Sequence, residues 1–173
     1  MTHRTSLPTV AILWAILGPA PAAAQHGHEH RRADSDTAFA SMQARGKSAM
    51  GVDQYTSAHQ FQDLADGGRI ELQRDSTDSA GVAEIRAHLQ SIATAFGSGN
   101  FDVPGFVHAG EVPGTAIMRQ RRNDITYRFH PLPGGGEVRI GSTDTTAVRA
   151  VHEFLAFQRR EHRVEHAHER IEP

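Results

Sequence analysis

The residues of this sequence best suited to chemistry are its histidines, of which there are 12 among 173 residues, with no cysteine. Imidazole nitrogens are ligands that copper, zinc and nickel prefer, and a methionine thioether adds affinity for Cu(I). Four histidines and one methionine between the polar ends of the chain form the candidate metal-binding set: His59, His88, His108, His152 and Met118. This set predicts a site for a copper or zinc ion.

Side-chain periodicity indicates that these histidines point inward. His59 is two residues from Phe61 on a predicted strand, so both side chains lie on the same face. On a predicted helix, His88 follows the apolar Ile85 by three residues and therefore lies on or beside the buried stripe. The alternative for each inward histidine is a hydrogen-bonded residue of the core or its boundary.

The other histidines of the folded region follow the same periodicities. His152 comes four residues after Val148 on a second predicted helix, and His162 continues that side toward the helix end. His108 follows an apolar pair in a connector, from which we expect it to fold back over the sheet. His130 falls on the outer strand face and is expected to be solvated.

An internal repeat supplies the elements that position these side chains. Residues 60–72 align without gaps on residues 128–140, so that a phenylalanine, a leucine and two glycines coincide. After a length difference of two residues the match resumes, and Leu89 aligns on Leu155. Each copy predicts a strand, a Gly-rich turn, a strand and a helix. The predicted fold class is α+β, with a duplicated strand-strand-helix unit forming a four-stranded antiparallel sheet and two helices packed on one face.

The predicted organisation places one folded domain between polar ends. The boundaries are a signal peptide at 1–24, a mobile His-containing arm at 25–50, an α+β domain at 51–163 and a polar tail at 164–173. Within the domain, repeat 1 spans 59–96, a connector spans 97–124 and repeat 2 spans 125–163. Short helices are expected at 37–45 in the arm and at 115–122 in the connector, which is too long for a simple link.

The first residues have the order of a cleavable secretory signal. A basic start is followed by the apolar run Leu7 to Leu17 and by small residues up to Ala24, after which cleavage is expected. The apolar run is shorter than the roughly 20 residues of a membrane-spanning anchor, which is the alternative. The protein is therefore expected in the periplasm or secreted, with no membrane association after cleavage.

Cleavage there would expose a second candidate metal site at the new N-terminus. The sequence His26-Gly27-His28-Glu29-His30 is typical of short tracts that hold metals loosely. The new amino group and His26 could together chelate Cu(II) or Ni(II). The alternative is that His26, His28 and His30 belong to a polar spacer.

Composition excludes several classes of function. With 18 Lys plus Arg against 20 Asp plus Glu, the net charge is −2, and nucleic acid is not an expected partner. The absence of cysteine excludes disulfides, thiolate metal sites and cysteine nucleophiles. The sequence has no nucleophile elbow, phosphate-binding Gly loop or haem-attachment motif, so no catalytic residue is predicted.

Segments that run from about Met50 to Arg163 carry a resemblance to a known group of proteins. They include the turn Asp66-Gly67-Gly68 and the helical sequences Ile85-Arg86-Ala87-His88-Leu89 and Val151-His152-Glu153-Phe154-Leu155. In these, and in the His-rich stretch after the signal, the chain resembles a group of small exported bacterial proteins of unestablished function. Gln60 and Ser91 stand where members of that group can have further histidines.

Some members of that group carry the label aspartate carbamoyltransferase. That activity is not expected here, because the enzyme needs two doubly wound domains and a Ser-Thr-Arg-Thr phosphate loop. The leading hypothesis is a non-catalytic, exported protein that handles copper or zinc. The alternative is an interaction or small-ligand-binding module with structural histidines, in which Arg119, Arg121 and Arg122 bind a periplasmic protein or an anion.

Overall fold

A computed structural model describes residues 23–51 and 56–164, with side chains from Asp36 onward. The chain divides into two compact units, residues 1–34 and residues 35–173. Of the first unit only the helical backbone from Ala23 is described, so the predicted signal peptide and the side chains of the N-terminal histidines lie outside the described residues. The same holds for nearly all of the polar tail. No helix in the described ranges is long and apolar enough to cross a membrane.

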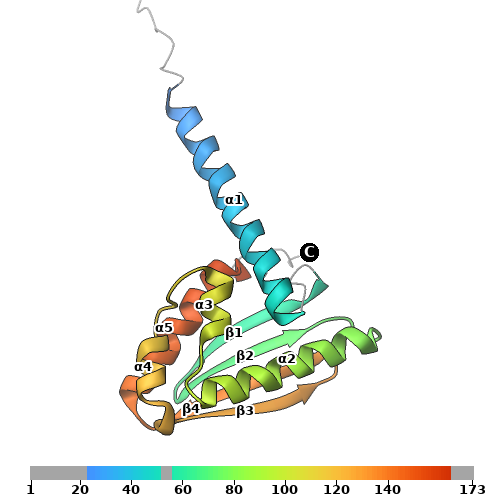
Figure 1. Ribbon diagram of the computed structural model, residues 1–173, viewed down its shortest axis with the longest axis vertical. Helices are drawn as coiled ribbons and strands as arrows, with labels where there is room; N and C mark the ends of the chain where they lie inside the picture. Colours follow the sequence, from blue (N-terminus) through green and yellow to red (C-terminus); the bar gives the residue numbers. More distant parts are fainter. Residues whose placement is uncertain (1–22, 52–55, 165–173) are drawn as a thin grey trace, which may run out of the picture. The chain divides into compact units, whose positions relative to one another are not determined.

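The second unit is built on one antiparallel sheet with the strand order β1-β2-β4-β3 (Figure 1). Its strands are β1 Ala58–Leu64, β2 Gly67–Gln73, β3 Ile125–Leu132 and β4 Gly135–Ser142. Each repeat forms one hairpin, and the two hairpins join through β2 and β4, where Ile70 lies opposite Val138. Both of these side chains are buried on the inner face of the sheet.

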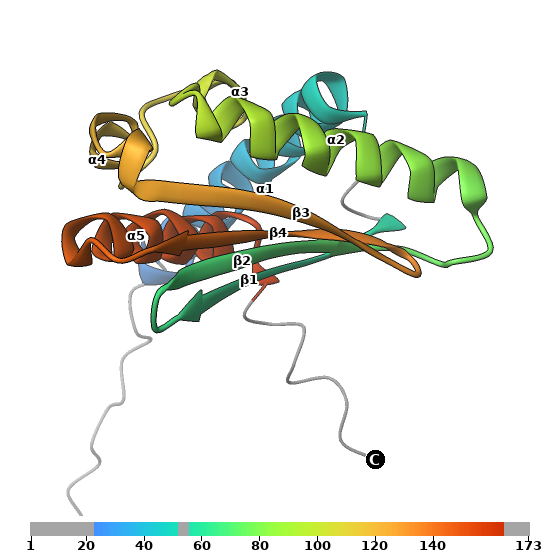
Figure 2. The same cartoon turned by 90° about the horizontal axis from the view of Figure 1, so that it is seen from below.

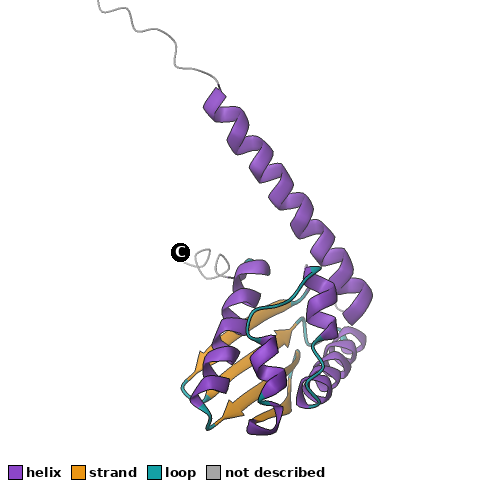
Figure 3. Cartoon of the chain, turned by 60° about the vertical axis from the view of Figure 1, so that its left-hand side comes forward, coloured by secondary structure: helices purple, strands orange, loops and turns teal. Residues whose placement is uncertain are grey.

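Two long helices cover that inner face, which confirms the predicted α+β class (Figure 3). Helix α2, Ser79–Gly97, lies mainly on β3 and β4, and α5, Thr145–Glu161, lies mainly on β1 and β2 (Figure 2). The helix of each repeat therefore packs on the hairpin of the other repeat. Asp78 and Asp144 cap the starts of these helices, because their carboxylates accept hydrogen bonds from the first free backbone N–H groups.

The connector contains more helix than its sequence predicted. The expected helix near 115–122 is present as α4, Thr115–Gln120, followed by the 3-10 turn η2, Arg122–Asp124. An additional helix, α3, spans Asp102–His108. Pro104 is compatible with this helix, because it lies in the first turn, where the backbone N–H that proline lacks would have no partner within the helix.

Helix α1, Ala23–Met50, is longer than the helix expected at 37–45. No proline interrupts this range, and its alanine, arginine, glutamine and methionine residues favour helix. Its last turns contact the rest of the second unit: Met42 is buried, and the Arg45 Nε atom donates a hydrogen bond of 2.8 Å to the Val107 carbonyl. The expectation of a mobile arm is therefore corrected for residues 35–50.

Gly114 allows the connector to lie directly against α5. Its φ is 83°, and a Cβ atom at this position would overlap the carbonyl oxygen of Ala150. We expect Gly114→Ala to lower the free energy of unfolding by about 2 kcal/mol or more, from backbone strain and overpacking together. Urea denaturation measures this change. Gly110→Ala is the matched control, because no atom lies within 4 Å of its added Cβ; equal stability of the two variants would contradict the prediction.

Candidate functional site

A small cavity of about 50 Å³ lies among β1, β2, α2, α3 and α5 of the second unit. Most of its lining is apolar and comes from the hydrophobic core. Five polar side chains also line it, and we call the whole the histidine cavity: His59, His88, His108, Gln158 and His162. Three of the five predicted ligands of the folded region thus lie around one cavity.

The centre of the site is a pair of stacked imidazoles from different repeats. His59 points inward from β1, as predicted, and His162 immediately follows the end of α5. Their ring centres are 5.5 Å apart and their planes differ by 12°. Only 9% of the His59 surface is exposed, and its Nδ1 atom has no hydrogen-bond partner among the described residues. A buried polar atom without a partner costs free energy that the fold must offset elsewhere.

His108, the last residue of α3, adds a third imidazole to this pair and lies against the end of α5. Its ring centre is 5.4 Å from that of His162, with the planes at 86°. The ring also contacts Phe157, and its Nε2 atom lies 3.2 Å from Oε1 of Gln158. Because Arg45 hydrogen-bonds the neighbouring carbonyl of Val107, the last turns of α1 help to hold His108 in place.

Burial keeps the imidazoles of the cavity uncharged. It lowers the pKa of His59 and of His88 to about 4, and the pKa of His162 to about 3. Burial also lowers the pKa of His108. A backbone group of Ser57 raises the pKa of His59, but it does not reach hydrogen-bond geometry with the Nδ1 atom. All four side chains are neutral at pH 7, which is the form of histidine that binds metal ions.

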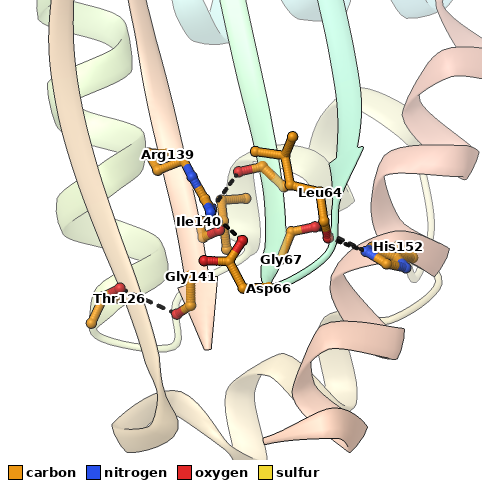
Figure 4. A network of polar contacts seen from close by, with 9 residues as sticks. Leu64, Asp66, Gly67, Thr126, Arg139, Ile140, Gly141 and His152 are labelled. Carbon is orange, nitrogen blue, oxygen red and sulfur yellow. Dashed lines mark hydrogen bonds and ion pairs between the residues drawn. The ribbon is translucent and has the colours of Figure 1, made fainter. Parts of the chain in front are cut away.

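His152 and Met118 do not line this cavity, so the structure does not bring them together with the other three predicted ligands. The His152 Nε2 atom lies 2.9 Å from the Gly67 carbonyl and 3.0 Å from the Leu64 carbonyl, at the turn between β1 and β2 (Figure 4). Since carbonyl oxygens only accept, this nitrogen carries the proton and fastens α5 to the turn. Along α5, His152 is also about 15 Å from His162. Met118 is fully buried in the core.

The repeat gives the stacked imidazoles an aromatic counterpart in the other half of the fold. By the alignment of the two copies, His59 corresponds to Tyr127 on β3, and His162 corresponds to Phe96 on α2. Tyr127 and Phe96 also contact each other, edge to face, with ring centres 5.8 Å apart. The architecture therefore accepts two apolar rings at this contact. The corresponding contact in the other half of the fold is made without imidazoles, which favours a functional role for the pair.

Sequence reasoning left three residues out of the site. His162 was expected to continue the inward side of its helix but was not named as a ligand, although its alignment with buried Phe96 could have indicated its place. Gln158 and Met50 line the cavity as well. Met50 was not predicted as a site residue, because it lies in the segment 25–50, which was expected to be a mobile arm.

Two of the three arginines proposed to bind a partner are used within the fold. The Arg119 Nε atom donates a 3.1 Å hydrogen bond to the Gly99 carbonyl, and Arg121 forms a 3.2 Å ion pair with Asp144. These interactions hold the connector against the ends of α2 and α5. His130 is exposed, as predicted.

Comparison of the chain with protein-family models, curated proteins and solved structures finds no match. Within the described ranges, no group of three or more His, Asp or Glu side chains is placed so that it could hold a metal ion. Function is therefore inferred from where the rings lie and from how they can turn.

Proposed function

We propose that this protein is an exported, non-catalytic transition-metal-binding protein that handles copper or zinc in the histidine cavity. The observation that carries the proposal is the spacing of three neutral imidazoles, in which His59 and His108 lie 5.5 and 5.4 Å from His162 between ring centres. Export is supported by the sequence of residues 1–24, which has the order of a secretory signal.

The ring-centre spacing matches that of imidazoles sharing one ion. A nitrogen bound at about 2 Å places its ring centre about 3 Å from the metal. Two such ligands at tetrahedral or trigonal angles then have ring centres about 5 to 5.5 Å apart. The separations of His162 from His59 and from His108 both agree with this value.

Rotation of the rings can bring the nitrogens to a common point. The torsion about the Cβ–Cγ bond of histidine has a broad energy minimum. Its axis passes close to the ring centre, so turning the ring moves the nitrogens while the centre stays in place. The stacking of His59 on His162 is then exchanged for coordination, and the unpartnered Nδ1 atom of His59 gains a partner.

The size of the cavity favours an ion over an organic ligand. Sites for small organic molecules have volumes of about 300 to 1,000 Å³, whereas this cavity has about 50 Å³. That volume holds an ion with one or two waters.

Replacing the central imidazole tests the proposal. We expect His162→Phe to weaken binding of Cu(I) or Zn(II) by at least about 100-fold, because both close ring pairs of the site include His162. Affinity is measured by competition with a chromophoric chelator. All proteins carry His26→Gln, His28→Gln and His30→Gln, so that the N-terminal histidines do not contribute.

The matched control is His130→Gln, which removes one exposed histidine far from the cavity lining. It should bind either ion like the parent protein. Equal affinity of the His162→Phe and His130→Gln variants would show that the histidine cavity is not the metal site.

A further inference from the structure

We propose that the histidine cavity selects Cu(I) over divalent ions, with the Met50 thioether as a ligand beside the imidazoles. This inference rests on the proposed function and specifies the ion. It follows from the charge of the cavity, the chemistry of its donor atoms and the position of Met50.

The cavity offers no negative charge to offset that of an ion. Among the described residues that line it, none carries a carboxylate. Two charged groups act on His108, and their effects oppose each other. Glu161 raises the pKa of His108, and Arg45 lowers it. The desolvation cost of an ion rises with the square of its charge, so a divalent ion costs about four times as much as a monovalent one. Without a carboxylate, that difference favours Cu(I) over Zn(II) and Cu(II).

Met50 adds a soft donor to this uncharged set. It is the last residue of α1, it packs against the core and it lines the cavity together with His59 and His108. Thioether sulfur prefers Cu(I) to Zn(II), and imidazole binds both. Gly46, one turn before Met50 in α1, leaves room for the long side chain of Met50. The Met50 Cε atom lies 3.2 Å from the position that a Cβ on Gly46 would occupy.

Two measurements on the protein with the three N-terminal histidines replaced by glutamine test the selectivity. The first compares Cu(I) with Zn(II), each added as the ion alone under anaerobic conditions and measured by chelator competition. We expect Cu(I) to bind at least 100-fold more tightly. The second repeats both titrations on Met50→Leu, which should lose at least tenfold in Cu(I) affinity and keep its Zn(II) affinity. Met42→Leu, a buried methionine two turns earlier on α1 and outside the cavity lining, should change neither.

A third variant tests the charge argument without depending on methionine. Val103 lines the cavity and is 36% exposed, so Val103→Glu can place a carboxylate at its mouth. This variant should gain Zn(II) affinity at least tenfold relative to Cu(I). Parent protein that binds Zn(II) as tightly as Cu(I), or Met50→Leu and Val103→Glu variants with the parent's selectivity, would overturn the inference while the proposed metal site stands. Binding of neither ion by the parent would overturn both.

Discussion

Replacing His59 and His162 together by phenylalanine is expected to raise the free energy of unfolding by about 1 to 3 kcal/mol and to abolish metal binding. The gain comes from removing the buried polar atoms of His59, whose Nδ1 has no hydrogen-bond partner among the described residues. Phenylalanine is larger than histidine, and the adjacent cavity of about 50 Å³ provides the space. Phenylalanine is preferred to tyrosine at position 59, because the hydroxyl of the corresponding Tyr127 is buried without a hydrogen-bond partner among the described residues.

The reciprocal exchange in the other half of the fold is the control for this variant. Phe96→His with Tyr127→His places imidazoles at the corresponding contact, where Phe96 is almost completely buried. This variant should lose about 3 kcal/mol or more, since burial of large apolar rings is exchanged for unsatisfied polar atoms. Urea denaturation at pH 7 without metal compares the two variants with the parent. A parent protein more stable than His59→Phe, His162→Phe would mean that the imidazoles contribute to the fold.

Stability of the parent protein is expected to fall by several kcal/mol as the pH drops from 6.5 to 4. In the folded state the pKa is about 4 for His59 and for His88, and about 3 for His162. In the unfolded chain histidine has its ordinary pKa near 6.5. Between these values the unfolded chain binds more protons, so acid favours unfolding. The stabilisation is complete above pH 6.5 and is lost progressively down to pH 4.

Urea denaturation between pH 7.5 and 4 measures this dependence. Carboxylates such as Asp144, whose pKa is lowered by hydrogen bonds from the Ala147 and Thr146 backbone, contribute mainly below this window. The His59→Phe, His162→Phe variant isolates the contribution of these two imidazoles and should show a shallower slope between pH 6.5 and 4.5. The His130→Gln variant should keep the parent's slope. A parallel decline of all three proteins would assign the acid sensitivity to groups other than His59 and His162.

The sequence predicted the four strands and the two long helices α2 and α5 well, because each of these elements has local causes. Alternation along the strands, glycines in the turns and aspartates at the helix starts are readable over a few residues, and all of them recur at positions related by the repeat. The extent of α1 was not predicted. Its residues favour helix, but its last turns are held by tertiary contacts, such as the hydrogen bond of Arg45 to Val107 in α3, which a local pattern does not contain.

The site was predicted only in part, because it depends on which elements meet. Periodicity correctly assigned an inward direction to His59, yet an inward direction is shared by every position on that face. His152 satisfies the same rule as His162 but lies near the middle of α5, where it bonds the β1–β2 turn. The pairing of His59 with His162 required knowing that α5 covers the strands of the other repeat.

That exchange of helices between the repeats has a consequence for how the two halves could diverge. A single strand-strand-helix unit leaves its own strands uncovered, so one copy alone would have to associate with an identical copy. In such a symmetric pair every ring contact between strand and helix would occur twice, with the same residues in both places. Joining two copies in one chain removes that constraint. The contact between Phe96 and Tyr127 can then keep its aromatic rings and supply stability. The contact between His59 and His162 is free to acquire imidazoles, because the other half offsets the stability that they cost.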